Sequence, residues 1–202
     1  MRRAAILCLL LLAGCGASVD GNIGAGDLAS VAEPAPPVPQ DGYHDDDRNE
    51  PSSFTLDYLR RTSEGAEDRA IVVAVQEAGF ERGYQKAWAG DIGDGGASAG
   101  VALFLFHDDS RTHDVLGVVE RQYRRSLGEE LEDVDAAGLG DESWGGHTGG
   151  DDESTLYAWR SRNLVAVVYV GCFPGCDAED HVGDIARSYA DAVDDRIDSA
   201  GR

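Results

Sequence analysis

The chain has 202 residues, with 38 acidic against 17 basic side chains and a formal net charge of −21 at pH 7. Proteins that bind nucleic acid neutralise phosphates with lysine and arginine, so this charge balance excludes a nucleic-acid partner. It also excludes a domain that lies flat on an anionic lipid surface, which would repel it. A high net charge keeps proteins soluble and opposes their self-association, and we therefore expect a monomer with a solvated acidic surface.

The first residues have the pattern of an export signal. Two arginines precede ten apolar residues at 4–13, a run too short for a membrane-spanning helix of about 20 residues and typical of a signal peptide. The sequence LAGC ending at Cys15 resembles the lipobox of bacterial lipoproteins. That resemblance implies removal of residues 1–14 and attachment of diacylglycerol to the Cys15 thiol. An ordinary signal peptide with an incidental cysteine is the alternative.

A lipid on Cys15 would anchor the protein without any membrane span, because two or three acyl chains together give stable binding. We therefore expect the protein to be located on the extracytoplasmic face of the cell membrane, or on the outer membrane in a host that has one. Cys8 lies within the apolar run and is expected to leave with the signal peptide.

Residues 15–52 are predicted to form the lipidated cysteine and a disordered, acidic and proline-rich linker. Five of the six prolines fall between positions 34 and 51, and no apolar periodicity is present. A flexible chain of n residues has an end-to-end distance of roughly 5–6 Å × √n, so this linker would hold the domain tens of ångströms from the bilayer. The sequence HDDD at 44–47 lacks a second ligand cluster at a defined spacing and indicates a solvated tail.

Residues 53–200 are predicted to form one α+β domain. An antiparallel sheet of about five strands is packed by about three helices, in the order α-β-β-α-β-β-β-α. The helices are expected at 64–78, 110–127 and 178–197, although the IVVAV run at 71–75 would also suit a strand. Segments 80–88 and 101–106 form a hairpin with GDIGDGGASAG as its loop. Two further strands, 154–160 and 163–171, surround a turn at 161–163.

The order of several segments resembles a known kind of domain. These segments are GFERGYQKAWAG, VALFLFHDDSRTHDVLGVV, AAGLGDESWG and LYAWRSRNLVAVVYVG, followed by a last helix. Over about residues 55–198 the chain is similar to domains of actinobacterial surface lipoproteins and to extracytoplasmic sensor regions of some bacterial kinases, with a PsbP/Mog1-like layout. The resemblance implies an extracytoplasmic α+β domain, and it assigns no reaction or ligand to particular residues.

Two cysteines remain in the domain, Cys172 and Cys176 in the sequence GCFPGC. An even pair outside the cytoplasm is expected to form a disulfide, and the Pro-Gly between them favours the turn that this requires. A thioredoxin-like redox pair has two intervening residues, whereas this pair has three. A zinc site would need two further ligands, and only His181 is near.

Phe80, Tyr84 and Trp88 fall on one face of an extended segment, and Trp159 lies in a later strand. These residues are a candidate binding face for a small apolar ligand. The alternative is that the rings form the core against a helix.

No set of residues assembles a catalytic or metal site. The sequence DESWG at 141–145 lacks the first glycine of G-x-S-x-G, and GDIGDGG lacks both the EF-hand spacing and the Gly-Lys-Ser/Thr of a nucleotide loop. We expect no cofactor, no metal and no catalytic residue. The hypothesis is a non-catalytic, sensor-like binding module of the cell envelope that contacts an envelope protein or a small apolar ligand. An accessory lipoprotein without a pocket and an envelope enzyme are the alternatives.

Overall fold

A computed structural model of the chain describes residues 21–37, 44–45, 52–63, 66–92, 95–127, 131–150, 153–172 and 182–201. Cys15 and Cys176, which carry two of the sequence predictions, lie outside these residues. The helices are α1 Leu28–Val31, α2 Leu56–Thr62, α3 Ala66–Glu77, α4 Thr112–Leu127 and α5 Val182–Ala200. The strands are β1 His44–Asp45, β2 Ser52–Phe54, β3 Phe80–Ile92, β4 Gly95–Phe106, β5 Leu131–Val134, β6 Glu142–Thr148, β7 Ser154–Ser161 and β8 Leu164–Cys172.

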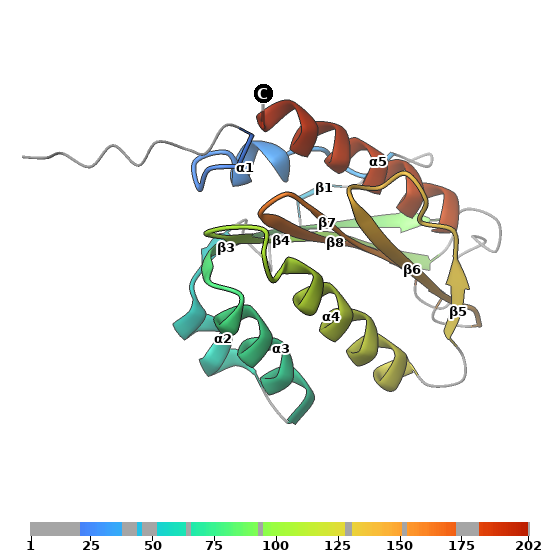
Figure 1. Cartoon of the computed structure of the whole chain (residues 1–202). Helices are drawn as coiled ribbons and strands as arrows, with labels where there is room; N and C mark the ends of the chain where they lie inside the picture. Colours follow the sequence, from blue (N-terminus) through green and yellow to red (C-terminus); the bar gives the residue numbers. More distant parts are fainter. Residues whose placement is uncertain are drawn as a thin grey trace, which may run out of the picture.

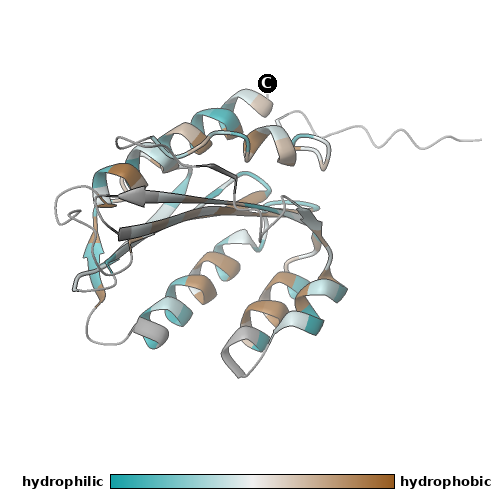
Figure 2. Cartoon of the chain, turned by 180° about the vertical axis from the view of Figure 1, so that it is seen from behind, coloured by the Kyte–Doolittle hydropathy of each residue, from teal (hydrophilic) through white to brown (hydrophobic). Residues whose placement is uncertain are grey.

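The strands form one antiparallel sheet in the order β1-β3-β4-β8-β7-β6-β5, and β2 also pairs with β3. Helices α1 and α5 cover one face of the sheet, and α2, α3 and α4 cover the other (Figure 1). Each face has its own apolar core. The long helices alternate apolar and hydrophilic positions, as Figure 2 shows, because each buries one side against the sheet. Within the described residues, no helix is long and apolar enough to cross a membrane.

The α+β class and the antiparallel sheet are therefore confirmed, but the predicted counts of about five strands and three helices are wrong. The described residues form eight strands, seven along the main path plus β2, and five helices. The elements missing from the prediction are α1, α2, β1, β2 and β5, which have two to seven residues each. Segments this short do not complete enough periods to stand out in a sequence.

The hairpin β3–β4 is much longer than predicted. Most of the expected loop GDIGDGGASAG continues the two strands, which end at Ile92 and resume at Gly95. Ala97 and Ala99 are buried in the core beneath α5, and β4 pairs with β3 on one side and β8 on the other. Pairing on both sides overrides the low strand propensity of glycine and alanine.

Residues 21–37, which we call the N-terminal strap, correct the prediction of a disordered linker. Ile23, Leu28, Val31 and Ala32 are at most 3% exposed and belong to the same core as α5. The amide of Ile23 donates to Asn163 Oδ1 (3.0 Å), and Asn163 Nδ2 donates to the Ile23 carbonyl oxygen (3.1 Å). This part of the predicted linker is therefore part of the folded domain.

Candidate functional site

The predicted aromatic residues are packed in or against the two cores of the domain. Trp88 and Trp159 are 2% and 0% exposed in the core beneath α5, and Tyr84 packs against the same core. The Trp88 ring meets Tyr189 edge to face with centroids 5.4 Å apart, and Trp159 Nε1 donates to Asp194 Oδ1 over 2.8 Å. These rings are core residues, which was the alternative interpretation.

Phe80 lies on the opposite face of the sheet, so the prediction that it shares a face with Tyr84 and Trp88 is wrong. A bulge between Phe80 and Arg82 shifts the register of β3 against β4 by one residue. A one-residue shift reverses the face on which a side chain lies. Phe80 consequently packs in a cluster of aromatic rings on the α2–α4 side, which contains Phe54, Phe104 and Phe106.

Of the three cysteines that carry predictions, the structure describes only Cys172. Cys172 ends β8 and is 3% exposed. Cys176 and Cys15 lie outside the described residues, so the disulfide and the lipid attachment stay predictions. The part of the chain that the structure describes contains no group of three or more histidine, cysteine, aspartate or glutamate side chains arranged to hold a metal ion.

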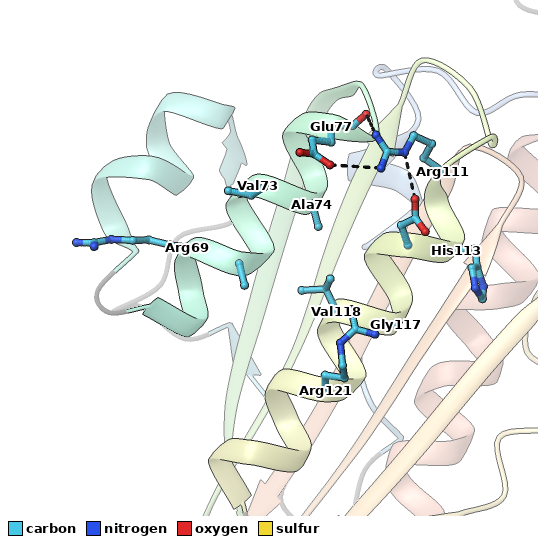
Figure 3. Close-up of a pocket in the computed structure, with 11 residues that line it drawn as sticks. Arg69, Val73, Ala74, Glu77, Arg111, His113, Gly117, Val118 and Arg121 are labelled. Carbon is cyan, nitrogen blue, oxygen red and sulfur yellow. Dashed lines mark hydrogen bonds and ion pairs between the residues drawn. The ribbon is translucent and has the colours of Figure 1, made fainter.

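A groove of about 620 Å³ lies between helices α3 and α4 (Figure 3). We call it the α3–α4 groove. Its apolar lining residues are Ala70, Val73, Ala74 and Val118, with Gly117 between them. Ala74 and Val118 point toward each other across it (Figure 3). Val73 is 53% exposed, and Tyr58 on α2 is the other exposed large hydrophobic residue in the described part of the chain.

The two helices create this groove because each has more apolar residues than its sheet-facing side can bury. In α3, Val72 and Val75 are buried, which turns Val73 outward. In α4, Val115 and Val119 are buried against the sheet, so Val118 lies on the flank toward α3. A valine on the solvent side of a surface helix is an exposed apolar contact point.

One end of the groove is closed by the Arg111 side chain. Its Nε donates to Asp114 (3.1 Å), Nη2 pairs with the Glu77 carboxylate (3.3 Å), and Nη1 donates to the Glu77 carbonyl oxygen (3.1 Å). The hydrogen bond to Asp114 raises the pKa of Arg111, so the guanidinium stays charged. This arrangement ties the start of α4 to the end of α3, and it satisfies the charge of Arg111 within the chain.

Arg121 lies along the groove on α4, beside Gly117 and Val118 (Figure 3). A Cβ placed at Gly117 would lie 3.2 Å from Arg121 Nη1, so the glycine provides the space in which the guanidinium rests. Among the described residues, Arg121 has no carboxylate partner. The groove therefore combines an apolar floor with the guanidinium of Arg121, which is unpaired within the described part of the chain.

The other cationic residues that border the groove point elsewhere. Arg69 extends from α3 away from α4 (Figure 3). His113 turns toward strand β6, where its Nδ1 lies 2.7 Å from the Glu142 carboxylate. Glu142 also accepts from Arg160 Nε (2.9 Å). The hydrogen bonds from His113 and Arg160, in that order, lower the pKa of Glu142, which makes this cluster an ion-paired connection between α4 and the sheet.

A smaller hollow of about 330 Å³ lies on the same side of the sheet, near the second half of α4. Tyr123 and Tyr169 border it, and Ala102 and Val167 belong to its floor. Burial raises the pKa of Tyr123. The hollow is mainly apolar, and it is not lined by Trp88 or Trp159.

The two helical layers differ in charge. Helix α5 carries five aspartates against two arginines. Helices α2, α3 and α4 together carry six acidic and six basic residues. In a chain with a net charge of −21, the α2–α4 layer is therefore the face that an anionic partner approaches with the least repulsion.

The chain matches no protein-family model and no curated protein. Among solved structures, it is similar to the extracellular domain of PknH from Mycobacterium tuberculosis, with 10% identity and a TM-score of 0.42. The match covers 88% of this chain and 93% of that one. A likeness this low carries no functional information.

Proposed function

We propose that the protein is a non-catalytic binding module of the cell envelope, anchored by a lipid on Cys15, which docks a partner protein through the α3–α4 groove. The partner segment places an apolar side chain against Val73 and Val118 and a carboxylate next to Arg121. The observation that carries this proposal is the exposed apolar floor beside an arginine for which the described part of the chain provides no carboxylate.

The core favours a protein partner over a small ligand held among the aromatic residues. Trp88 and Trp159 are packed against neighbouring side chains and do not line the α3–α4 groove or the smaller hollow. The open apolar surface around Val73 and Val118 lies on two neighbouring helices, where the side chains of an approaching segment can insert between them. Apolar anchors surrounded by polar residues are the usual centre of a protein–protein contact.

The charge of Arg121 indicates that the partner carries negative charge where it contacts the groove. Arg121 is exposed at the rim, where one ion pair is worth about 0.2–1 kcal/mol. Reversing its charge turns that attraction into repulsion of similar size, so Arg121→Glu should weaken binding by about 0.4–2 kcal/mol, or roughly two- to thirty-fold. Arg121→Gln, which removes the charge alone, should have about half that effect in free energy.

Photo-crosslinking in the native envelope tests the groove. A benzophenone amino acid at Val73 is expected to give one discrete adduct, which mass spectrometry then identifies. Position Ser188 is the matched control, because it is exposed on α5 in the opposite layer. Adding Arg121→Glu should reduce the Val73 adduct several-fold. Equal, diffuse crosslinking at Val73 and Ser188, unchanged by Arg121→Glu, would show that the groove is not a docking site.

The anchor is tested independently. Cys15→Ser should move the protein from the membrane fraction to the soluble fraction, because a chain without acyl groups has no stable hold on the bilayer. Intact-mass measurement of the native protein should show loss of residues 1–14 and addition of the lipid. A Cys15→Ser chain that stays with membranes would contradict the anchor and leave the groove test unaffected.

A further inference from the structure

The N-terminal strap joins the domain at one defined corner. A Cβ placed at Gly201, just after α5, would lie 3.0 Å from the carbonyl oxygen of Gly21. Two residues later, Ile23 exchanges hydrogen bonds with Asn163 in the turn between β7 and β8. The chain therefore meets the folded domain beside the C-terminal end of α5, and α1 lies close to that end (Figure 1).

The strap is held at this corner by burial as well as by hydrogen bonds. Leu28 and Val31 are each 1% exposed, in a core that also contains Ile197 of α5. Asn163 is 3% exposed and donates to the Phe106 carbonyl oxygen (3.0 Å) as well as to Ile23. Releasing the strap would expose these apolar side chains and leave buried polar groups without partners, so we expect it to stay docked in the native protein.

The docked strap shortens the tether. Six peptide steps separate Cys15 from Gly21, and at about 3.3–3.6 Å per residue they reach at most about 22 Å. A flexible linker over the whole of residues 16–52 would have an end-to-end distance of roughly 30–37 Å and a far longer maximum reach. The lipid and the corner of the domain at Gly21 are therefore held close together.

We infer that the protein presents a fixed end to the lipid headgroups, formed by the C-terminal end of α5 and the β7–β8 turn. This inference rests on the proposed lipid at Cys15. Helix α5 has 19 residues and is about 28 Å long, which exceeds the reach of the tether and allows its N-terminal end to lie well away from the bilayer. Helices α3 and α4, which form the groove, lie on the opposite face of the sheet from α5 (Figure 1), where a partner can approach the groove without displacing the tether.

The lipid surface that suits this end is zwitterionic. The last turns of α5 carry Asp194, Asp195 and Asp198 with Arg196. Arg162 of the β7–β8 turn pairs with Asp198 over 3.8 Å, and Asp194 accepts from Trp159 Nε1. An anionic bilayer attracts basic residues and repels acidic ones within about a Debye length. The short tether thus sets the distance, and the small acidic excess at this end favours neutral headgroups over anionic ones.

Quenching by a headgroup-bound nitroxide tests this orientation. The lipidated protein is reconstituted into phosphatidylcholine vesicles and labelled at one genetically encoded site with a small fluorophore. Ser199 and Asp184 are the two labelling sites, because both are exposed on α5 and they are 15 residues apart, or about 22 Å along the helix axis. We expect quenching at Ser199 to exceed that at Asp184 at least three-fold.

A matched variant with a flexible 20-residue Gly/Ser insert after Ser18 lengthens the tether without changing the strap. It should lose most of the difference between the two positions. Equal quenching at Ser199 and Asp184 in vesicle-bound protein, or a difference that survives the insert, would overturn the fixed end while leaving the anchor in place. Protein that fails to float with the vesicles would instead contradict the lipid on Cys15.

Discussion

Leu28 gives the sharpest test of whether the strap is part of the folded domain. Its side chain is 1% exposed within the core beneath α5. Leu28→Ala removes three carbon atoms, which corresponds to about 2.4 kcal/mol at about 0.8 kcal/mol per buried methylene. The cavity left behind adds to this loss, although a strap at the edge of the core can relax into part of it. We expect the free energy of unfolding to fall by about 2–3 kcal/mol.

The assay is urea unfolding of a chain that lacks residues 1–14 and carries Cys15→Ser. Tryptophan fluorescence is the readout. With a slope of about 2 kcal/mol per molar urea, the midpoint should fall by about 1–1.5 M. Ser30→Ala is the matched control, because Ser30 is exposed on the same short helix and its change should stay within about 0.5 kcal/mol. If Leu28→Ala has no larger effect than Ser30→Ala, the strap does not contribute to the fold.

Three further variants probe separate parts of the structure. Asn163→Ala leaves both polar groups of the Ile23 backbone without their partner and should cost about 2–4 kcal/mol in urea unfolding, with faster hydrogen exchange at the Ile23 amide; unchanged exchange would contradict the pairing. The Tyr189 hydroxyl is buried without a hydrogen-bond partner among the described residues, so Tyr189→Phe should raise the free energy of unfolding by about 1 kcal/mol, and a clear loss would show an unrecognised partner. The pKa of Glu142 is lowered below its ordinary value of 4.5, so its stabilisation is present above that pH and disappears as the pH falls through the folded-state value. Glu142→Gln should therefore be less stable than the native chain at pH 6, and the two should converge as the pH falls below 4.5 and through the folded-state pKa of Glu142; a gap that stays constant with pH would refute the ion pair.

Long periodic segments account for what the sequence predicts well. Helices α3, α4 and α5 have apolar residues at helical spacing, and the β7–β8 hairpin combines two apolar runs with a tight turn. The strap has no such period. Its apolar residues are separated by glycine, alanine and aspartate, and they are buried by α5, which lies about 150 residues later in the sequence. Only the tertiary contact reveals that they belong to the core.

The candidate site was less visible in the sequence. The bulge that moves Phe80 to the other face of the sheet leaves no sequence signal, because any residue can occupy it. Val73 does leave a sequence signal, since the IVVAV run contains one more valine than the sheet-facing side of α3 can bury. Gly117 within α4 is a second sequence signal, because glycine in a helix interior lowers stability and is usually present for a packing reason. Its neighbour in space, Arg121, resembles any other surface arginine in the sequence.

The most direct test of a charged docking groove is the affinity of the purified domain for the protein crosslinked at Val73. Titration calorimetry of the native chain, Arg121→Gln and Arg121→Glu at low and high salt measures it. We predict affinity that falls in that order, by about ten-fold from the first to the last, with the differences shrinking at high salt because exposed charges are screened. Equal affinities of all three chains at low salt would contradict the assignment of the α3–α4 groove as the binding surface.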